Sequence, residues 1–129
     1  CEAGAAARGL SRAVRLACLL HDASEAFISD ITRPVKRQLT EYKEIEHRLQ
    51  AVIYRRFGID PNDSTVMAAV SQIDDAMLYH EFLALGGLAL YDSAPEIYSA
   101  PDFGFAPFEA TEKLYLSTLD DLIKKGENI

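Results

Sequence analysis

The sequence predicts an all-α fold, and three observations support that prediction. Apolar residues recur at the spacing of amphipathic helices along most of the 129-residue chain. Ser, Thr, Gly and Pro stand where such helices would begin and end. No segment has the apolar–polar alternation of a convincing strand. We therefore expect a compact helical bundle of about five to six helices, with residues 1–129 forming a single domain.

The first expected helix runs from about residue 7 to residue 27. Cys18 and His21 recur on its apolar face, and Ser11 is available as an N-cap. Pro34 disfavours helical geometry at the residue before it, so a turn should follow this helix. A second, short helix should begin at Pro34, because proline is favoured in the first helical turn.

Two long helices are expected in the middle of the chain. One should run from about residue 41 to 57, with Gly58 as its left-handed stop, and the other from about residue 65 to 85, with Ser64 as its N-cap. Their apolar stripes consist of Tyr42, Ile45, Leu49, Val52, Ile53 and Phe57 in the first, and Val66, Val70, Ile73, Met77, Leu78 and Phe82 in the second.

The stretch after the glycine pair 86–87 is rich in Gly, Pro, Ser and aromatic residues, which predicts a long loop. The sequence leaves room for a short helix near residues 88–91. A last helix is expected from about residue 108 to 125, with leucines at positions 114, 116, 119 and 122 available for packing.

Composition limits the partners of the chain. The formal charge is -7, with 13 Lys and Arg against 20 Asp and Glu, which argues against a nucleic-acid polymer as ligand. A mononucleotide is compatible with this balance, and the carboxylates suit a divalent cation. No run approaches the roughly 20 apolar residues that cross a bilayer, so we expect no membrane partner. We expect a cytoplasmic protein, and the sequence leaves a homodimer open.

The two cysteines are too few for a disulfide framework and lack the spacing of a metal–thiolate motif. Cys18 lies in the run LACLL and is expected to be a buried small hydrophobe.

The strongest chemical signal is the segment His21-Asp22-Ala23-Ser24-Glu25. A helix places His21 and Glu25 one turn apart, whereas Asp22 projects about 100° further round and joins them only near a helix end or a close helix crossing. An imidazole and a carboxylate are suitable ligands for Mn, Co, Fe, Zn or Mg. A His-Asp pair on its own is better explained as a polar helix terminus than as a metal site.

The combined pattern is more specific than this segment alone. LLHDASEAF, then Asp30, the Pro34-Val35-Lys36 turn, and Asp74 with Glu81 downstream resemble the HD-domain phosphohydrolases, closest to the branch that includes bacterial 5′-deoxynucleotidases. The resemblance runs from about residue 14 to residue 81. It implies an HD-domain-like fold, one divalent metal ion, and hydrolysis of a small-molecule phosphomonoester such as a nucleoside or deoxynucleoside 5′-monophosphate.

The resemblance also implies roles for individual residues. His21, Asp22 and Asp74 match the metal ligands of the family. Glu25 matches the residue that orients or deprotonates the attacking water, and Asp30 matches one that positions water or protonates the leaving group.

Two positively charged side chains complete the expected site: Lys36 and Arg33 are candidates for substrate binding. A helix cap explains Asp30 about as well as catalysis does.

The position of Asp74 supports a cation independently of the resemblance. It shares an inward-facing stripe with Met77, Leu78 and Glu81, where a carboxylate is costly unless it is paired or metal-bound. An ion pair with Arg33 or Lys36 is the competing explanation.

Three other polar residues are not expected to belong to the site. Asp75 points away from the stripe and should be solvated. His80 and His47 are not expected to join the site, so one metal ion is the better prediction.

The chain departs from the family in one respect. The usual first metal ligand is another histidine on a helix upstream of the HD motif, and the sequence opens with Cys1. We interpret the chain as N-terminally truncated, and the enzyme reading requires that histidine in the parent protein. The alternatives are a non-catalytic HD-like module with a decayed metal site, which binds a nucleotide or a partner, and a plain helical interaction domain.

Overall fold

The computed structural model describes the backbone of residues 1–127 and the side chains of residues 1–126. Within these residues the chain is all-helical and contains no strand, as expected. Its helical segments are α1 (Glu2–Ala7), α2 (Arg12–Leu20), α3 (Glu25–Ile28), α4 (Arg33–Lys36), α5 (Thr40–Arg56), α6 (Ser64–Gly86) and α7 (Phe108–Glu127). The described part thus has seven segments rather than five to six, because the first expected helix is divided into α2 and α3 and because α1 precedes it.

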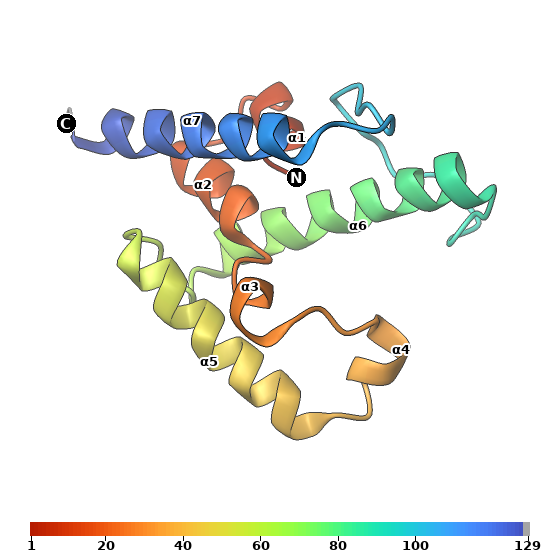
Figure 1. Cartoon of the computed structure of the whole chain (residues 1–129), viewed down its shortest axis with the longest axis horizontal. Coiled ribbons are helices and arrows are strands. Elements are labelled where there is room, and N and C mark those ends of the chain that lie inside the picture. The colour runs from red at the N-terminus through yellow and green to blue at the C-terminus, as the bar shows by residue number, and fades with distance from the viewer. Residues whose placement is uncertain (128–129) are drawn as a thin grey trace.

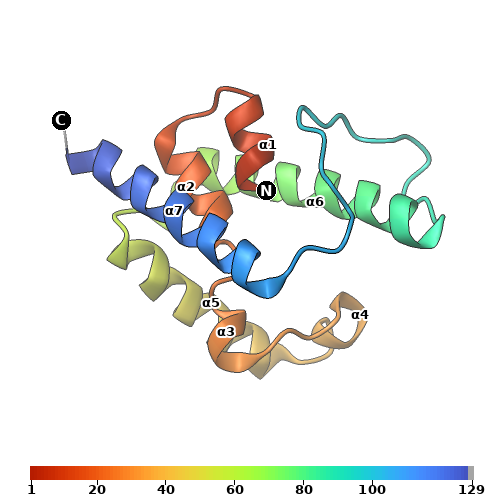
Figure 2. The same ribbon diagram turned by 45° about the horizontal axis from the view of Figure 1, so that its top comes forward.

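Helix α2 is the central element of the bundle. It packs against α1, α6, α7 and α5, which surround it in both views (Figures 1 and 2). Its apolar residues are correspondingly buried: Val14, Leu16, Ala17, Cys18 and Leu20. The predicted burial of Cys18 is confirmed, with 2% of its surface exposed. The end of α2 is therefore rigidly supported from several sides.

The prediction of one helix from residue 7 to residue 27 was wrong at both ends. Gly9 adopts the left-handed region at φ 65° and separates α1 from α2, a conformation that glycine adopts without steric cost. Ser11 then caps α2, and its hydroxyl accepts from the backbone N–H of Val14 at 3.4 Å. Helix α2 already ends at Leu20.

Residues 21–24 form a tight turn between α2 and α3. The backbone N–H groups of Ala23 and Glu25 donate to the carbonyls three residues earlier, at 3.0 Å each. Such bonds replace the four-residue spacing of an α-helix and wind the chain more tightly. The turn contains His21 and Asp22, so both side chains lie at a helix end.

The two long middle helices lie within one to two residues of their predicted bounds. Helix α6 is capped by Asp63 rather than by the predicted Ser64, since the Asp63 carboxylate accepts from two backbone N–H groups at 3.0 and 3.1 Å. Gly58 has φ 72° after α5, as predicted, and Gly87 has φ 64° after α6.

The apolar stripes of these helices were predicted only in part. Ala51 and Tyr54 are the buried residues of α5, whereas Ile45 and Val52 of the expected stripe are 46% and 60% exposed. In α6 the stripe is buried as far as Ile73 and half-buried at positions 77 and 78. Phe82 is exposed, because the end of α6 projects beyond the central helix (Figure 1).

Residues 87–107 form the long connection expected from their composition, and they contain no helix, so the short helix considered near residues 88–91 is absent. Helix α7 follows and covers one side of α2 (Figure 2). Its Leu122 is 1% exposed, whereas Leu114 and Leu116 remain exposed. Among the described residues, no helix combines the length and apolar character needed to cross a bilayer.

Candidate metal centre

The carboxyl end of α2 is fixed by side chains from three directions. The last four carbonyls of a helix lack partners within it. In α2 each of them accepts a side-chain hydrogen bond: Ala17 from Tyr54 Oη at 3.4 Å, Cys18 from His21 Nδ1 at 2.8 Å, Leu19 from Tyr115 Oη at 3.2 Å, and Leu20 from Gln50 Nε2 at 2.7 Å. The turn that follows α2 therefore starts from a well-determined position.

Gln50 of α5 holds both ends of that turn. Its amide nitrogen donates to the Leu20 carbonyl at 2.7 Å, and its amide oxygen accepts from the backbone N–H of Ser24 at 3.1 Å. Ser24 is 2% exposed, so this pairing satisfies a buried donor. Gln50 was not identified from the sequence, because it belongs to no local motif and its neighbours in α5 are charged or apolar residues.

The His21 ring is oriented by its backbone contact. Nδ1 must donate to the Cys18 carbonyl, which leaves Nε2 facing two carboxylates. Nε2 lies 3.0 Å from Oδ2 of Asp22 and 3.2 Å from Oδ1 of Asp74. Asp22 reaches the same point as His21 because both occupy the tight turn at the helix end. Both predicted carboxylate ligands thus contact Nε2, but the group of described residues whose ligand atoms all lie within 4.8 Å of one another consists of Cys1, His21 and Asp74 and does not include Asp22.

The protonation state of His21 follows from this environment. Burial lowers its pKa, but hydrogen bonds to Asp22 and Asp74 and the charges of these two carboxylates outweigh burial and raise the pKa to about 10. In the metal-free protein both ring nitrogens therefore carry a proton. A cation bound at Nε2 would have to displace one of them, whereas the bond from Nδ1 can remain.

Asp74 uses its two carboxylate oxygens differently. Oδ1 faces His21, and Oδ2 accepts from Arg33 Nη2 at 3.1 Å. The hydrogen bond from His21 lowers the pKa of Asp74; burial opposes that shift, and the positive charges of His21 and Arg33 add to it. The ion pair that competed with a metal as the explanation for Asp74 is therefore present, but it engages only one oxygen.

Asp75 is a correction to the sequence prediction. It was expected to be solvated, and 46% of its side chain is exposed, but it also pairs with Nη1 of Arg33 at 3.1 Å, which was not expected. The guanidinium of Arg33 is long and forked, so it spans the two consecutive aspartates even though their side chains diverge on the helix.

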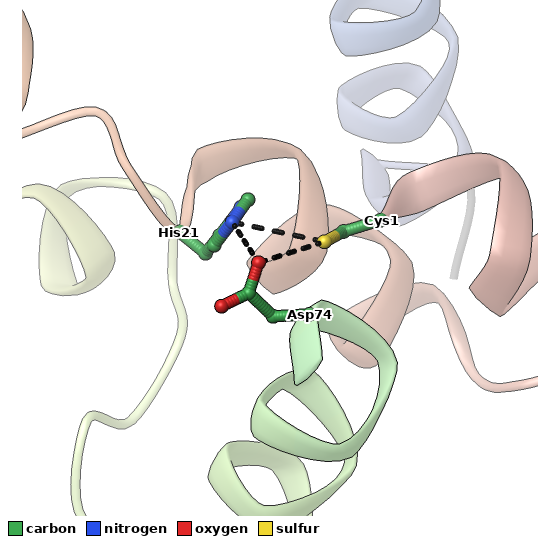
Figure 3. A group of neighbouring side chains, drawn as sticks. All are labelled: Cys1, His21 and Asp74. Atoms are coloured by element: carbon green, nitrogen blue, oxygen red, sulfur yellow. Dashed lines mark hydrogen bonds and ion pairs between the residues drawn. The ribbon is translucent and has the colours of Figure 1, made fainter. Parts of the chain in front are cut away.

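Cys1 is the contributor that the sequence did not reveal. Its sulfur lies 3.7 Å from Nε2 of His21 and 3.6 Å from Oδ1 of Asp74, and the three side chains point toward one another from α6, the end of α2 and the start of α1 (Figure 3). The ligand atoms of these residues all lie within 4.8 Å of one another. A single cysteine without a second metal-binding residue nearby in sequence gives no recognisable motif.

All the predicted site residues line one cleft of about 870 Å³. They are His21, Asp22, Glu25, Asp30, Arg33, Lys36 and Asp74. Glu81 also lines this cleft and is exposed. It was expected to face the apolar core together with Asp74, so that prediction was wrong.

Glu25 lies at the start of α3 and faces the cleft beside Lys36. Burial raises its pKa, and the negative charges of Asp22 and Asp30 add to that shift, while Lys36 opposes it. Lys36 Nζ lies 3.8 Å from Oε1 of Glu25 and 2.7 Å from Oε1 of Glu46 on α5. A carboxylate with a raised pKa is a better proton acceptor, and a neighbouring ammonium can bind an anion.

The donors at this centre fit a divalent cation. Two carboxylates each contact the imidazole Nε2, and Nδ1 of the imidazole is hydrogen-bonded to a carbonyl, as is usual for metal-binding histidines. The same contacts are those of a hydrogen-bonded ion pair. Such a pair forms between a protonated His21 and the two carboxylates when no metal ion is bound. The site is therefore a stable polar cluster whose geometry suits an ion.

The remaining histidines lie outside the centre. His80 donates from Nε2 to the carbonyl of Pro95 at 2.8 Å. His47 is exposed on α5. These positions agree with the expectation that neither would join the centre.

The chain is similar to two curated bacterial proteins. It is 43% identical over 68 residues to the uncharacterized protein YfdR of Escherichia coli K12, a match that covers 53% of this chain and 36% of that protein. It is 31% identical over 96 residues to the uncharacterized protein RCAP_rcc00048 of Rhodobacter capsulatus, covering 73% of this chain and 48% of that protein. The aligned segments span less than half the length of either relative. No protein-family profile and no solved structure matches the chain.

Proposed function

We propose that this chain is a metal-dependent phosphohydrolase of the HD-domain type, acting on a nucleoside or deoxynucleoside 5′-monophosphate. The observation that carries the proposal is the meeting of His21 Nε2 with the carboxylates of Asp22 and Asp74, at 3.0 and 3.2 Å, in the cleft that also contains Glu25 and Lys36. These residues come from four separate segments of the chain. A shared cation gives one physical reason for gathering them.

His21, Asp22 and Asp74 would hold one divalent metal ion, either Mn, Co, Fe, Zn or Mg. Such an ion lowers the pKa of water and neutralises charge on phosphoryl oxygens. The negative charge of the two aspartates is suited to a divalent cation, and the imidazole favours a transition metal.

The other residues of the cleft supply proton transfer and substrate binding. Glu25 accepts the proton of the attacking water, which its raised pKa favours. Asp30 lines the same cleft, where it positions water, and Asp30 or a second water protonates the departing oxygen of the ester. Lys36 and Arg33 bind the phosphoryl oxygens, since each offers several N–H donors at the cleft.

The size and lining of the cleft suit a mononucleotide. A volume of about 870 Å³ falls within the range of small-molecule sites, roughly 300–1,000 Å³. Its lining also includes the apolar side chains of Met77, Leu78 and Phe103. An aromatic and aliphatic wall beside a charged end matches a ligand with a flat base and a phosphate.

Phosphate release tests this proposal. The purified full-length protein should release phosphate from nucleoside or deoxynucleoside 5′-monophosphates in Mn²⁺ or Co²⁺, and a chelator should abolish the reaction. An Asp74→Ala variant should be inactive. Turnover that persists after chelation, or wild-type turnover in Asp74→Ala, would contradict the proposal.

A nucleotide-binding module without catalysis is the second candidate, and one contact favours it. The guanidinium of Arg33 occupies Oδ2 of Asp74 and also pairs with Asp75, so it compensates part of the charge that a metal would neutralise. Equilibrium dialysis with a labelled nucleotide separates the two candidates. Binding without phosphate release, unchanged by a chelator, would favour the non-catalytic module.

A further inference from the structure

The start of α1 brings a sulfur atom to the proposed metal centre. Cys1 is the N-cap of α1, and its carbonyl accepts from the backbone N–H of Ala5 at 3.0 Å. Helix α1 packs against α2, which ends immediately before His21. The thiol is half-buried and faces His21 and Asp74 (Figure 3). Its position is thus determined by helix packing.

The distances within the trio match the edges of a coordination polyhedron. For bonds of about 2.0–2.1 Å to nitrogen or oxygen and about 2.3 Å to sulfur, a tetrahedral ion gives edges of about 3.4 Å between N and O and about 3.6 Å between sulfur and either. The structure has 3.2 Å between His21 Nε2 and Asp74 Oδ1. The Cys1 sulfur lies 3.7 and 3.6 Å from the same two atoms. Little movement is therefore needed for the three atoms to share an ion.

We propose that Cys1 is a metal ligand, and that His21, Asp74 and the Cys1 thiolate bind a soft divalent transition metal such as Zn, Co or Fe(II) in preference to Mg. The inference rests on the proposed function only in placing an ion at this centre. The resemblance to HD-domain phosphohydrolases assigns no role to a cysteine.

The chemistry of the donors supports this choice. Thiolates favour soft cations, whereas Mg²⁺ prefers oxygen ligands in octahedral geometry. On binding, the ion takes the place of the thiol proton and of the proton on His21 Nε2, and both protons are released to solvent. No electron is transferred in this step.

The position of the Cys1 thiol beside Asp74 also has an explanation that needs no metal ion. A thiol can donate a weak hydrogen bond to Asp74, and the 3.6 Å distance between sulfur and oxygen is compatible with that. Such a contact would leave the metal preference to the histidine and the carboxylates. Spectroscopy distinguishes a bound thiolate from a neighbouring thiol.

Cobalt titration is the test, because a thiolate bound to Co²⁺ gives a near-ultraviolet charge-transfer band that imidazole and carboxylate ligands do not give. The chain has two cysteines, and Cys18 is buried in the core at 2% exposure, so Cys18→Ala is the matched control for Cys1→Ser. We expect the band in the wild type and in Cys18→Ala. We expect Cys1→Ser to lose the band and to bind Co²⁺ at least about tenfold more weakly.

The outcomes separate the two proposals. Co²⁺ binding without the band in the wild type, or a band that persists in Cys1→Ser, would overturn the role of Cys1 and leave the proposed function standing. A wild-type protein that binds no Co²⁺ would overturn both. Excess Mg²⁺ should not displace Co²⁺ from the wild type, and displacement would contradict the stated preference.

A second measurement covers the case in which Cys18→Ala fails to fold. The wild type is treated with iodoacetamide with and without Zn²⁺, and alkylation of each cysteine is followed by mass spectrometry of its peptide. Zn²⁺ should slow the alkylation of Cys1. Equal rates for Cys1 with and without bound Zn²⁺ would overturn the inference.

Discussion

Nε2 of His21 lies 3.2 Å from Oδ1 of Asp74, although 53 residues separate the two in the chain. The contact joins the end of α2 to the middle of α6, two helices that pack against each other along the core. Asp22 approaches the same nitrogen from the turn after α2. This arrangement is the basis of the proposed metal centre, and each prediction below tests one residue that forms or supports it.

Glu25→Gln should separate catalysis from metal binding. The substitution keeps the size of the side chain but removes its ability to accept a proton, so phosphate release should fall by about a hundredfold or more. Metal affinity should change little, because Glu25 is not among the residues in contact with His21 Nε2. Steady-state kinetics and calorimetric metal titration measure the two effects. Glu44→Gln, on the exposed side of α5, is the control.

Lys36→Met should weaken phosphate binding. The substitution removes an ammonium that lies 3.8 Å from Glu25 in the cleft, and a lost hydrogen bond to a charged group corresponds to about a tenfold change in affinity. Inhibition by inorganic phosphate measures this directly, with Lys43→Met on exposed α5 as the control. An unchanged inhibition constant would mean that Lys36 serves only to pair with Glu25 and Glu46.

Gln50→Leu should loosen the turn that contains His21 and Asp22. It leaves the Leu20 carbonyl and the Ser24 N–H without their side-chain partner, at a cost of about 1–3 kcal/mol in the free energy of unfolding. Urea denaturation gives the loss of stability, and amide exchange at Ser24 reports the local opening.

Gln38→Leu provides the comparison for that experiment, since Gln38 is exposed and lies before α5. Full protection of the Ser24 amide in Gln50→Leu would show that the turn does not depend on Gln50.

The stability of the metal-free protein should fall as pH rises. His21 has a pKa of about 10 in the folded protein against its ordinary 6.5. Its interaction with the two aspartates therefore contributes fully to the free energy of unfolding below pH 6.5, and this contribution is lost as pH rises through about 10. Urea midpoints in excess chelator at pH 6 and pH 9.5 test this.

His21→Gln is the reference, because the remaining titrating groups are shared by both proteins. The stability difference between wild type and His21→Gln should shrink toward pH 9.5. A difference that stays constant between the two pH values would argue against the raised pKa.

The sequence predicted the helices with long apolar repeats and missed the short-range breaks. Helix α6 was located within one residue, because its apolar residues recur over many turns. The division around Gly9 and the tight turn at residues 21–24 were missed, since both run through segments that have helical spacing. Tertiary contacts, such as those of Gln50 with the turn, decide where such a helix ends.

The grouping of the candidate site residues in one cleft was predicted from the sequence, and their roles stay predictions. The HDASE segment and Asp74 were recognisable as local motifs, and the structure brings them together. Cys1 and Gln50 could not be found in this way, because their positions depend on how α1 and α5 pack. The partner of Arg33 was also open in sequence, and the structure shows that it pairs with both Asp74 and Asp75.

The most direct test of the account is calorimetric titration of Mn²⁺ into the wild type, Asp74→Asn and Asp75→Asn. Each substitution removes one charge and one contact of Arg33, but only Asp74 faces His21. Loss of residues that merely support a metal ligand costs about 10–100-fold in affinity, so loss of a ligand should cost at least about a hundredfold. The account predicts this loss in Asp74→Asn and near wild-type affinity in Asp75→Asn. Equal affinity in Asp74→Asn and the wild type would contradict the proposal of a shared metal ion.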